Sequence, residues 1–165
     1  MCVALVGLCA SAQEKGDMAV GLNLGVAPSL ESGASVTNFG IGAKFQYNVT
    51  NPIRVEADLD YWFKAKGMDV FDITANVHYL FNVGSKLKIY PLVGIGYAHL
   101  KASADFDIAG EDFSVSASAD KFLFNVGAGV EYPIANNLSI GAEIKYQYIK
   151  DFSRLPISVG VAYKF

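Results

Sequence analysis

Four charged residues stand at every second position of one short segment, where they could perform acid–base chemistry. They are Arg54, Glu56, Asp58 and Asp60. Two carboxyl groups on one face could act as a general acid and a general base. The alternative is a network of ion pairs inside the protein, because buried charges must be paired. We favour the network, because the polar face of this alternating pattern carries equal numbers of positive and negative residues along the whole chain, these four included.

Metal binding and nucleophilic catalysis find little support in the sequence. His78 and His99 are the only histidines, and the only cysteines, Cys2 and Cys9, lie in an apolar segment at the start of the chain. We find no zinc-ligand spacing, phosphate-binding loop or dinucleotide-binding motif. No arrangement of serine, histidine and acid is recognisable either. We therefore expect a protein that is not an enzyme and holds no metal or cofactor.

The first twelve residues have the features of a secretory signal peptide. The run CVALVGLCASAQ is the longest apolar stretch, and Ala10, Ser11 and Ala12 give a small-x-small cleavage site before Gln13. No Lys or Arg precedes the apolar run, which is consistent with a start site farther upstream. We predict a signal peptide at residues 1–12 and a mature domain at residues 13–165 without cysteine. The alternative is a frayed apolar terminus.

Composition argues against nucleic-acid binding and against membrane-spanning helices. The net charge is −3 and the pI is about 5.3, so the chain lacks the basic surface that binds nucleic acid. Hydrophobic residues make up 52% of the chain, yet no run approaches the roughly 18 apolar residues that a spanning helix needs. Nine Tyr and eleven Phe are typical of strands. The length of 165 residues predicts one domain.

Apolar residues alternate with polar residues or glycine along most of the chain, which is the period of a β-strand. We predict eight strands, at Asp17–Ala27, Asn38–Val49, Ile53–Phe63, Val70–Phe81, Leu87–His99, Lys121–Tyr132, Leu138–Ile149 and Ile157–Phe165. Such strands exceed the globular average of about 5–6 residues and match the roughly 9–11 residues of a tilted transmembrane strand. Short connections follow the second, fourth and sixth strands and longer ones follow the others, as in outer-membrane barrels.

The two faces of these strands decide between two kinds of closed barrel. Closure removes exposed strand edges. A secreted lipocalin-like barrel would turn its apolar face inward, around an apolar ligand, whereas a membrane barrel would turn it outward. Glycine pairs on the polar face favour the membrane barrel, because a narrow interior needs small residues beside long charged ones. The apolar face carries no charge in mid-strand, where lipid would penalise Arg or Lys by about 2–4 kcal/mol.

We therefore predict an all-β fold, an eight-stranded antiparallel up-and-down transmembrane β-barrel. Its interior is predicted to hold a balanced charge network, formed by Lys44, Arg54, Glu56, Asp58, Asp60, Asp72, Lys88, Lys121, Glu131, Glu143, Lys145 and Lys164. Aromatic residues near strand ends are predicted to form girdles at the two membrane interfaces. The girdle residues are Tyr47, Tyr61, Phe63, Phe71, Tyr79, Phe81, Tyr132, Tyr146 and Tyr148.

The chain resembles the small OmpA/OmpX-type outer-membrane β-barrel family, also described as porin-family proteins. The segment YPLVGIGYAHL (Tyr90–Leu100) is similar to a recurrent glycine-containing strand of that family. The alternation of Val161, Tyr163 and Phe165 resembles the C-terminal signal that the barrel-assembly machinery recognises. The resemblance implies the outer membrane of a gram-negative bacterium, with lipid, lipopolysaccharide and that machinery as partners.

An eight-stranded barrel has an interior that side chains just fill. We therefore expect a plugged lumen and a structural or surface-interaction role, with a narrow channel and a secreted ligand-binding barrel as alternatives. The longest loop, residues 101–120, is acidic and partly alternating, so the flanking strands could continue as a hairpin. Such a hairpin could bind an extracellular ligand along a free edge, and a merely solvated loop is the alternative. We expect a monomer.

Overall fold

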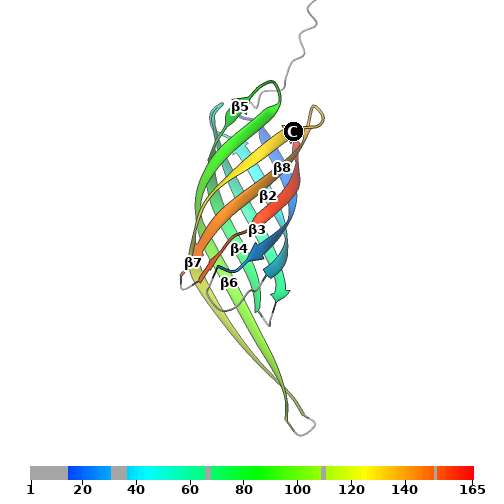
Figure 1. The fold of residues 1–165 in the computed structure, drawn as a ribbon, viewed down its shortest axis with the longest axis vertical. Coiled ribbons are helices and arrows are strands. Elements are labelled where there is room, and N and C mark those ends of the chain that lie inside the picture. The colour runs from blue at the N-terminus through cyan, green and yellow to red at the C-terminus, as the bar shows by residue number, and fades with distance from the viewer. Residues whose placement is uncertain (1–14, 31–36, 66–67, 109–110, 151) are drawn as a thin grey trace, which may run out of the picture.

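Ten β-strand segments wind around one axis in the computed structural model of the chain (Figure 1). The structure describes residues 15–30, 37–65, 68–108, 111–150 and 152–165. The predicted signal peptide, with Ala10 and Ala12, lies outside these residues. The segments are β1 (Met18–Pro28), β2 (Thr37–Asn48), β3 (Ile53–Ala65), β4 (Met68–Tyr79), β5 (Phe81–Val83), β6 (Leu87–Ile108), β7 (Glu111–Pro133), β8 (Leu138–Ile149), β9 (Phe152–Arg154) and β10 (Ile157–Lys164).

The sheet closes because the first and last strands pair with each other. β1 pairs antiparallel with β2 on one side and with β10 on the other, and β10 also pairs with β8. Each other strand pairs with its neighbours in the chain, in the order β1-β2-β3-β4-β6-β7-β8. The predicted antiparallel up-and-down barrel is confirmed, and its exposed edges disappear along the closed part of the wall.

Two of the eight strands that form the wall are interrupted by single breaks. β5 continues β4 in one register against β6, since His78 lies opposite Leu92 and Phe81 opposite Ile89. β9 continues into β10 in one register against β8 in the same way. Proline has no N–H to donate to a ladder. Pro91 lies opposite the first break, and Pro156 lies within the second. Because the register is the same on both sides of each break, the strand keeps its place in the sheet.

The largest departure from the predicted strands is a hairpin. The ladder between β6 and β7 runs without a shift from the pair Lys88 and Glu131 to the pair Ile108 and Glu111. Most of the segment predicted as a loop, residues 101–120, is therefore strand, which bears out its alternating pattern. The hairpin projects from one end of the barrel (Figure 1). A second correction concerns β9, which was predicted to be part of a loop at Lys150–Pro156.

The two ends of the barrel differ. One end, called here the turn-bearing rim, carries the short connections at residues 49–52, 84–86 and 134–137. The other end, called the loop-bearing rim, is where β1 and β3 end and from which the β6–β7 hairpin extends. The predicted contrast between short and long connections is only partly present, because β3 ends at Ala65 and β4 begins at Met68, which leaves a shorter connection than residues 49–52.

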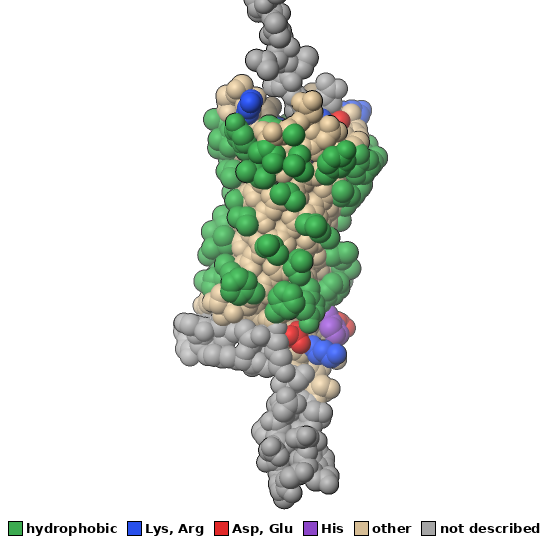
Figure 2. Space-filling view, turned by 90° about the vertical axis from the view of Figure 1, so that its right-hand side faces the viewer, with side chains coloured by type: hydrophobic (Ala, Val, Ile, Leu, Met, Phe, Trp, Pro, Cys, Tyr) green, Lys and Arg blue, Asp and Glu red, His purple; other side chains and the backbone are tan. Residues whose placement is uncertain are grey.

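Polarity is inverted relative to a water-soluble protein. Large apolar side chains point outward, among them Phe39 (69% exposed) and Val159 (59% exposed), and they cover the wall (Figure 2). Charged side chains point inward, and Arg54 and Asp72 are 0% exposed. A soluble monomer rarely exposes contiguous apolar patches above a few hundred Å², so this wall suits lipid. No helix in the described part of the chain is long and apolar enough to cross a membrane.

The charged lumen and its surroundings as the candidate functional site

The centre of the lumen holds a chain of alternating charges. Lys44 Nζ lies 2.7 Å from Glu143 Oε1 and 3.6 Å from Glu56 Oε2. Lys145 Nζ lies 2.7 Å from Asp58 Oδ2 and 3.4 Å from Glu143 Oε2. Glu143 therefore joins two lysines that stand on β2 and β8. All five side chains are at least nine-tenths buried, so each charge depends on its partner.

Nearer the turn-bearing rim, Arg54 organises a second group. Its Nη1 donates to Glu131 Oε2 at 2.5 Å, and its Nε donates to His78 Nδ1 at 3.2 Å. The His78 ring stacks on Tyr90 with 4.7 Å between centroids, and the guanidinium carbon of Arg54 lies 4.8 Å from the centre of the Tyr90 ring. Lys88 Nζ lies 3.7 Å from Glu131 Oε1. This group combines ion pairing with stacking, which suits the planar guanidinium.

Near the loop-bearing rim, Asp72 is the centre of a third group. It accepts hydrogen bonds from Arg154 and from Trp62 Nε1, the latter at 2.8 Å. Arg154 also donates to Gln147, and its guanidinium carbon lies 4.9 Å from the centre of the Trp62 ring. Farther toward the loop-bearing rim, an apolar cluster fills the mouth of the lumen. Its members are Ala27, Trp62, Val70, Ala98, Leu123 and Ile149.

Most residues of the predicted charge network meet in the lumen. The ten interior members are Lys44, Arg54, Glu56, Asp58, Asp60, Asp72, Lys88, Glu131, Glu143 and Lys145. Two members lie apart. Lys164 is partly exposed at the turn-bearing rim, 3.3 Å from Asp17, and Lys121 lies half-buried opposite Ala98 near the loop-bearing rim.

The two aspartates considered for acid–base chemistry have separate partners. Asp58 Oδ2 accepts from Lys145 Nζ at 2.7 Å and from Asn76 Nδ2 at 2.8 Å. Asp60 is hydrogen-bonded to Asn23. An acid held by a lysine and an amide has the environment of a structural ion pair. Among the described residues, no group of three or more His, Cys, Asp or Glu side chains could hold a metal ion.

Arg154 is a charged residue of this site that the sequence analysis missed. Lys150–Pro156 was predicted to be one of the longer loops. Nevertheless, Arg154 lies two positions before Pro156 and four before Ser158, on the same face as Gly160 and Lys164. Extending the polar face of the last strand backwards through the proline would have placed Arg154 inside the barrel.

The predicted girdle residues lie toward both ends of the strands. Tyr47, Tyr79, Phe81 and Tyr132 lie toward the turn-bearing rim, and Tyr61, Phe63, Phe71, Tyr146 and Tyr148 lie toward the loop-bearing rim. All point outward, and Tyr61 packs edge-to-face on Phe63 with 5.3 Å between ring centroids. Their role at membrane interfaces stays a prediction, as does the assembly role of Val161, Tyr163 and Phe165, which also point outward.

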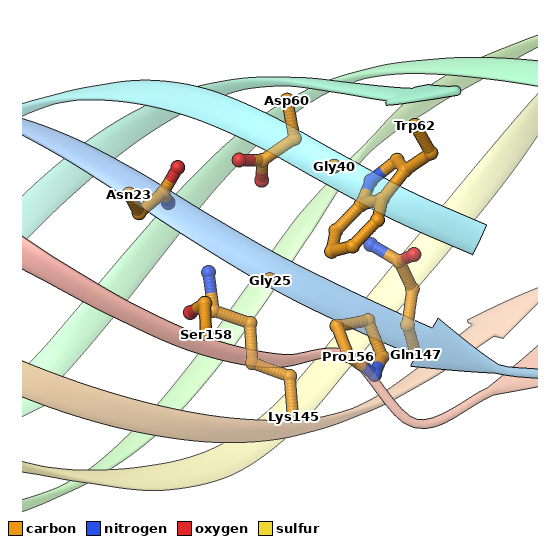
Figure 3. Close-up of a pocket in the computed structure, with 9 residues that line it drawn as sticks. All are labelled: Asn23, Gly25, Gly40, Asp60, Trp62, Lys145, Gln147, Pro156 and Ser158. Carbon is orange, nitrogen blue, oxygen red and sulfur yellow. The ribbon is translucent and has the colours of Figure 1, made fainter. Parts of the chain in front are cut away.

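Among the residues that the structure describes, three small cavities lie between the lumen side chains. The cavity at the turn-bearing rim measures about 30 Å³ and is lined in part by Lys88, Glu131 and Lys164. A second, of about 10 Å³, is lined in part by Lys44, Gln46 and Tyr90. The third, also about 10 Å³, is shown in Figure 3, with Asn23, Asp60, Trp62, Lys145 and Ser158 around it. Each has room for about one or two water molecules.

The comparisons with known proteins agree with this architecture. The family model "Outer membrane protein beta-barrel domain" matches residues 1–165, the whole chain. The chain belongs to this family. It is therefore an integral outer-membrane barrel, and the resemblance to outer-membrane barrels of the OmpA/OmpX type is confirmed. No curated protein matches the chain in sequence.

Solved outer-membrane barrels share the fold of this family member. Neisserial surface protein A (NspA), from Neisseria, is 25% identical with a TM-score of 0.68, and the match covers 90% of this chain and 97% of that one. Ail, the attachment invasion locus protein of Yersinia pestis, is 20% identical with a TM-score of 0.66, over 92% and 99% of the two chains. The N-terminal barrel domain of Pseudomonas aeruginosa OprF is 16% identical with a TM-score of 0.59, over 92% and 100%.

Proposed function

We propose that this outer-membrane barrel passes no solutes and acts as a structural and surface-interaction protein rather than as a pore or an enzyme. The observation that carries the proposal is the filling of the lumen. Its cavities measure about 10 to 30 Å³, which is the room that one or two waters need. A small ligand site usually measures about 300–1,000 Å³, so a metabolite would have to displace ion-paired side chains.

The apolar cluster at the loop-bearing rim supports the same proposal. Trp62, Val70, Leu123 and Ile149 are each at most 4% exposed and stand across the mouth of the lumen. Water and ions would have to cross this cluster to pass from the ion-paired interior to the loop-bearing side. A charge that enters an apolar constriction loses its hydration at a cost of several kcal/mol. The cluster therefore acts as a seal against solutes.

The β6–β7 hairpin is the part of the barrel that supports a surface role. Between Glu111 and Asp120, β7 pairs only with β6 among the residues that the structure describes, since its ladder with β8 begins at Leu123. Residues 101–120 carry five acidic residues and one lysine. An unpaired strand edge can accept an extended peptide as an added strand. We infer that the hairpin binds an extended basic polypeptide along this edge.

The surroundings of the barrel follow from the same proposal. The turn-bearing rim would face the periplasm of a gram-negative bacterium, and the hairpin would face the exterior. The apolar wall would contact outer-membrane lipid and lipopolysaccharide, and the barrel-assembly machinery would insert the chain. We propose a monomer, because one chain closes its own sheet.

Cell fractionation and planar-bilayer recordings test the central proposal. Producing cells should hold the protein in the outer-membrane fraction, and heating should shift its gel mobility as the barrel unfolds. The purified barrel should show no stable conductance in planar bilayers. Large, stable current steps would contradict the sealed lumen, and recovery in a soluble fraction would contradict the orientation of the apolar wall.

A shortened hairpin tests the surface role separately. Ala102 and Ala117 lie opposite each other in the β6–β7 ladder, so an Asn-Gly turn can replace residues 103–116 between them. The shortened barrel should keep its heat-dependent gel shift. It should lose binding to a fluorescent peptide of alternating Lys and Val, measured by anisotropy at low salt. Equal binding by both barrels would contradict the role of the hairpin edge.

A further inference from the structure

The three lumen cavities lie along one side of the barrel. Glu131, Ser139 and Ala162 line both the cavity at the turn-bearing rim and the second cavity, so these two adjoin. The second cavity reaches Gly160 on β10, and the third reaches Ser158, the next inward-facing residue of the same strand. The cavities thus follow β10 from the turn-bearing rim toward the other end.

The cavities follow β10 because many of the inward-facing residues of β1, β8 and β10 are small. At three successive levels, β1, β10 and β8 place inward-facing residues side by side. The levels are Gly21, Ala162 and Ser139, then Asn23, Gly160 and Gly141, then Gly25, Ser158 and Glu143. β3 places larger side chains inward instead, among them Arg54, Glu56 and Trp62. Small residues beside each other leave room that the charged side chains do not fill.

A buried amide supplies an independent indication that the cavities hold water. Gln46 lines the second cavity and is 3% exposed. Its Nε2 donates to Glu56 Oε2 at 2.6 Å, which fixes the orientation of the amide, and its Oε1 accepts no hydrogen bond from the described protein groups. A buried polar atom of this kind is ordinarily satisfied by an ordered water.

The third cavity ends at an indole. Trp62 lines it, as Figure 3 shows, and is also a member of the apolar cluster that fills the lumen mouth. The ring is held there by its hydrogen bond to Asp72 and by the guanidinium of Arg154. Between the second and third cavities stand Glu143 and the two lysines that it joins.

We propose that the small residues of β1, β8 and β10 enclose a file of water molecules that opens at the turn-bearing rim and is stopped at the loop-bearing rim by Trp62. The file admits water and ions of similar size into the interior of the barrel as far as Trp62, but it admits no metabolite. This inference rests on the proposed sealed lumen and adds the path by which the interior is hydrated and the residue that closes it.

Cysteine variants probed with Ag⁺, an ion of about the size of water, test the path. The barrel segment has no cysteine of its own, since Cys2 and Cys9 precede it. Ser139→Cys and Ser158→Cys place near-isosteric thiols beside the first and third cavities. Thr74→Cys is the control, because Thr74 also points into the lumen and bonds Asp58, the partner of Lys145, yet lines none of the three cavities.

The expected result is a difference in rate. Folded barrels are exposed to Ag⁺, unfolded, and titrated with a maleimide to count the remaining thiols. Both serine-site thiols should be modified at least roughly tenfold faster than the control thiol, which reacts only when the barrel opens. Equal rates at Ser158→Cys and Thr74→Cys would overturn the file. Reaction at Ser139→Cys alone would overturn its extension to Trp62.

Planar-bilayer conductance tests whether Trp62 closes the file. Trp62→Ala should convert the silent barrel into one with small current steps. Leu123→Ala, which truncates another member of the same apolar cluster that does not line the cavity, should stay silent. Adding Ser158→Leu to Trp62→Ala should silence it again by filling the third cavity. A silent Trp62→Ala barrel that still shows the heat-dependent gel shift would overturn the role of Trp62. A conducting wild-type barrel would instead contradict the sealed lumen.

Discussion

Arg154 and Asp72 form an ion pair across the interior of the barrel, although β9 and β4, which carry them, are not neighbours in the sheet. Both side chains are almost fully buried, and the pair lies next to the apolar cluster, on the side of the cluster that faces the lumen. A contact across the lumen fixes two distant parts of the wall relative to each other. Either residue alone would leave an uncompensated charge inside the barrel.

We predict that Asp72→Ala lowers the free energy of unfolding by about 3–5 kcal/mol, because Arg154 then stays buried without its carboxylate. The double variant Asp72→Leu/Arg154→Met should recover much of this loss, since it removes both charges. Denaturant unfolding in bilayers, followed by the heat-dependent gel shift, measures both. A double variant that is less stable than Asp72→Ala would show that the charges themselves stabilise the barrel.

The sequence was sufficient to predict the barrel but not the partners inside it. Period-two alternation places Glu56 and Asp58 on the inner face of β3 without knowledge of other strands. The pairing of Asp58 with Lys145 joins β3 to β8, and the alternation of one strand carries no information about which distant strand lies across the lumen. The closed sheet and its register supply that information.

The hairpin and Arg154 illustrate a second limit of the sequence. The alternation in residues 111–120 indicated strand, but hydrophobicity falls where β6 and β7 leave the wall, so the strand ends were predicted about nine residues too early in β6. At the other place the predicted strand was also too short, since it began after Pro156 and left out Arg154, which lies in β9. In both places the ladder of backbone hydrogen bonds continues where the side-chain pattern weakens.

We predict that Gly129→Ala destabilises the barrel by about 1–3 kcal/mol through overpacking. A methyl group on Gly129 would lie 2.5 to 2.6 Å from three atoms of Tyr90, whose ring is held between His78 and Arg54. Gly141→Ala is the control, because its methyl group would meet only Val130 O at 3.0 Å and Glu131 Cα at 4.0 Å.

A double-mutant cycle separates the contact from other effects of Gly129→Ala. Introduced into a Tyr90→Ala barrel, Gly129→Ala should cost much less, because the ring is gone. Urea unfolding of the four barrels provides the comparison. An unchanged cost in the Tyr90→Ala background would show that Tyr90 is not the source of the strain.

We predict that lysine on the outer wall is penalised according to depth. Leu59 lies at the middle of β3 and Val83 at the turn-bearing end of β5, and their exposed fractions, 47% and 48%, are nearly equal. Leu59→Lys should cost about 2–4 kcal/mol and Val83→Lys about 0–1 kcal/mol, because lipid penalises charge most at the midplane. Unfolding titrations in liposomes measure both. Equal, small costs would indicate a wall that faces water.

The last prediction concerns Phe165, which follows β10 and points outward at the turn-bearing rim. If the alternation of Val161, Tyr163 and Phe165 is an assembly signal, Phe165→Ala should lower the amount of protein in the outer membrane of producing cells. It should leave the stability of the purified, refolded barrel almost unchanged. Phe81→Ala is the control, because Phe81 is an outward-facing aromatic residue at the same rim. Equal losses of membrane-inserted protein from both variants would make Phe165 an ordinary interfacial residue, whereas a loss confined to Phe165→Ala would support recognition during insertion.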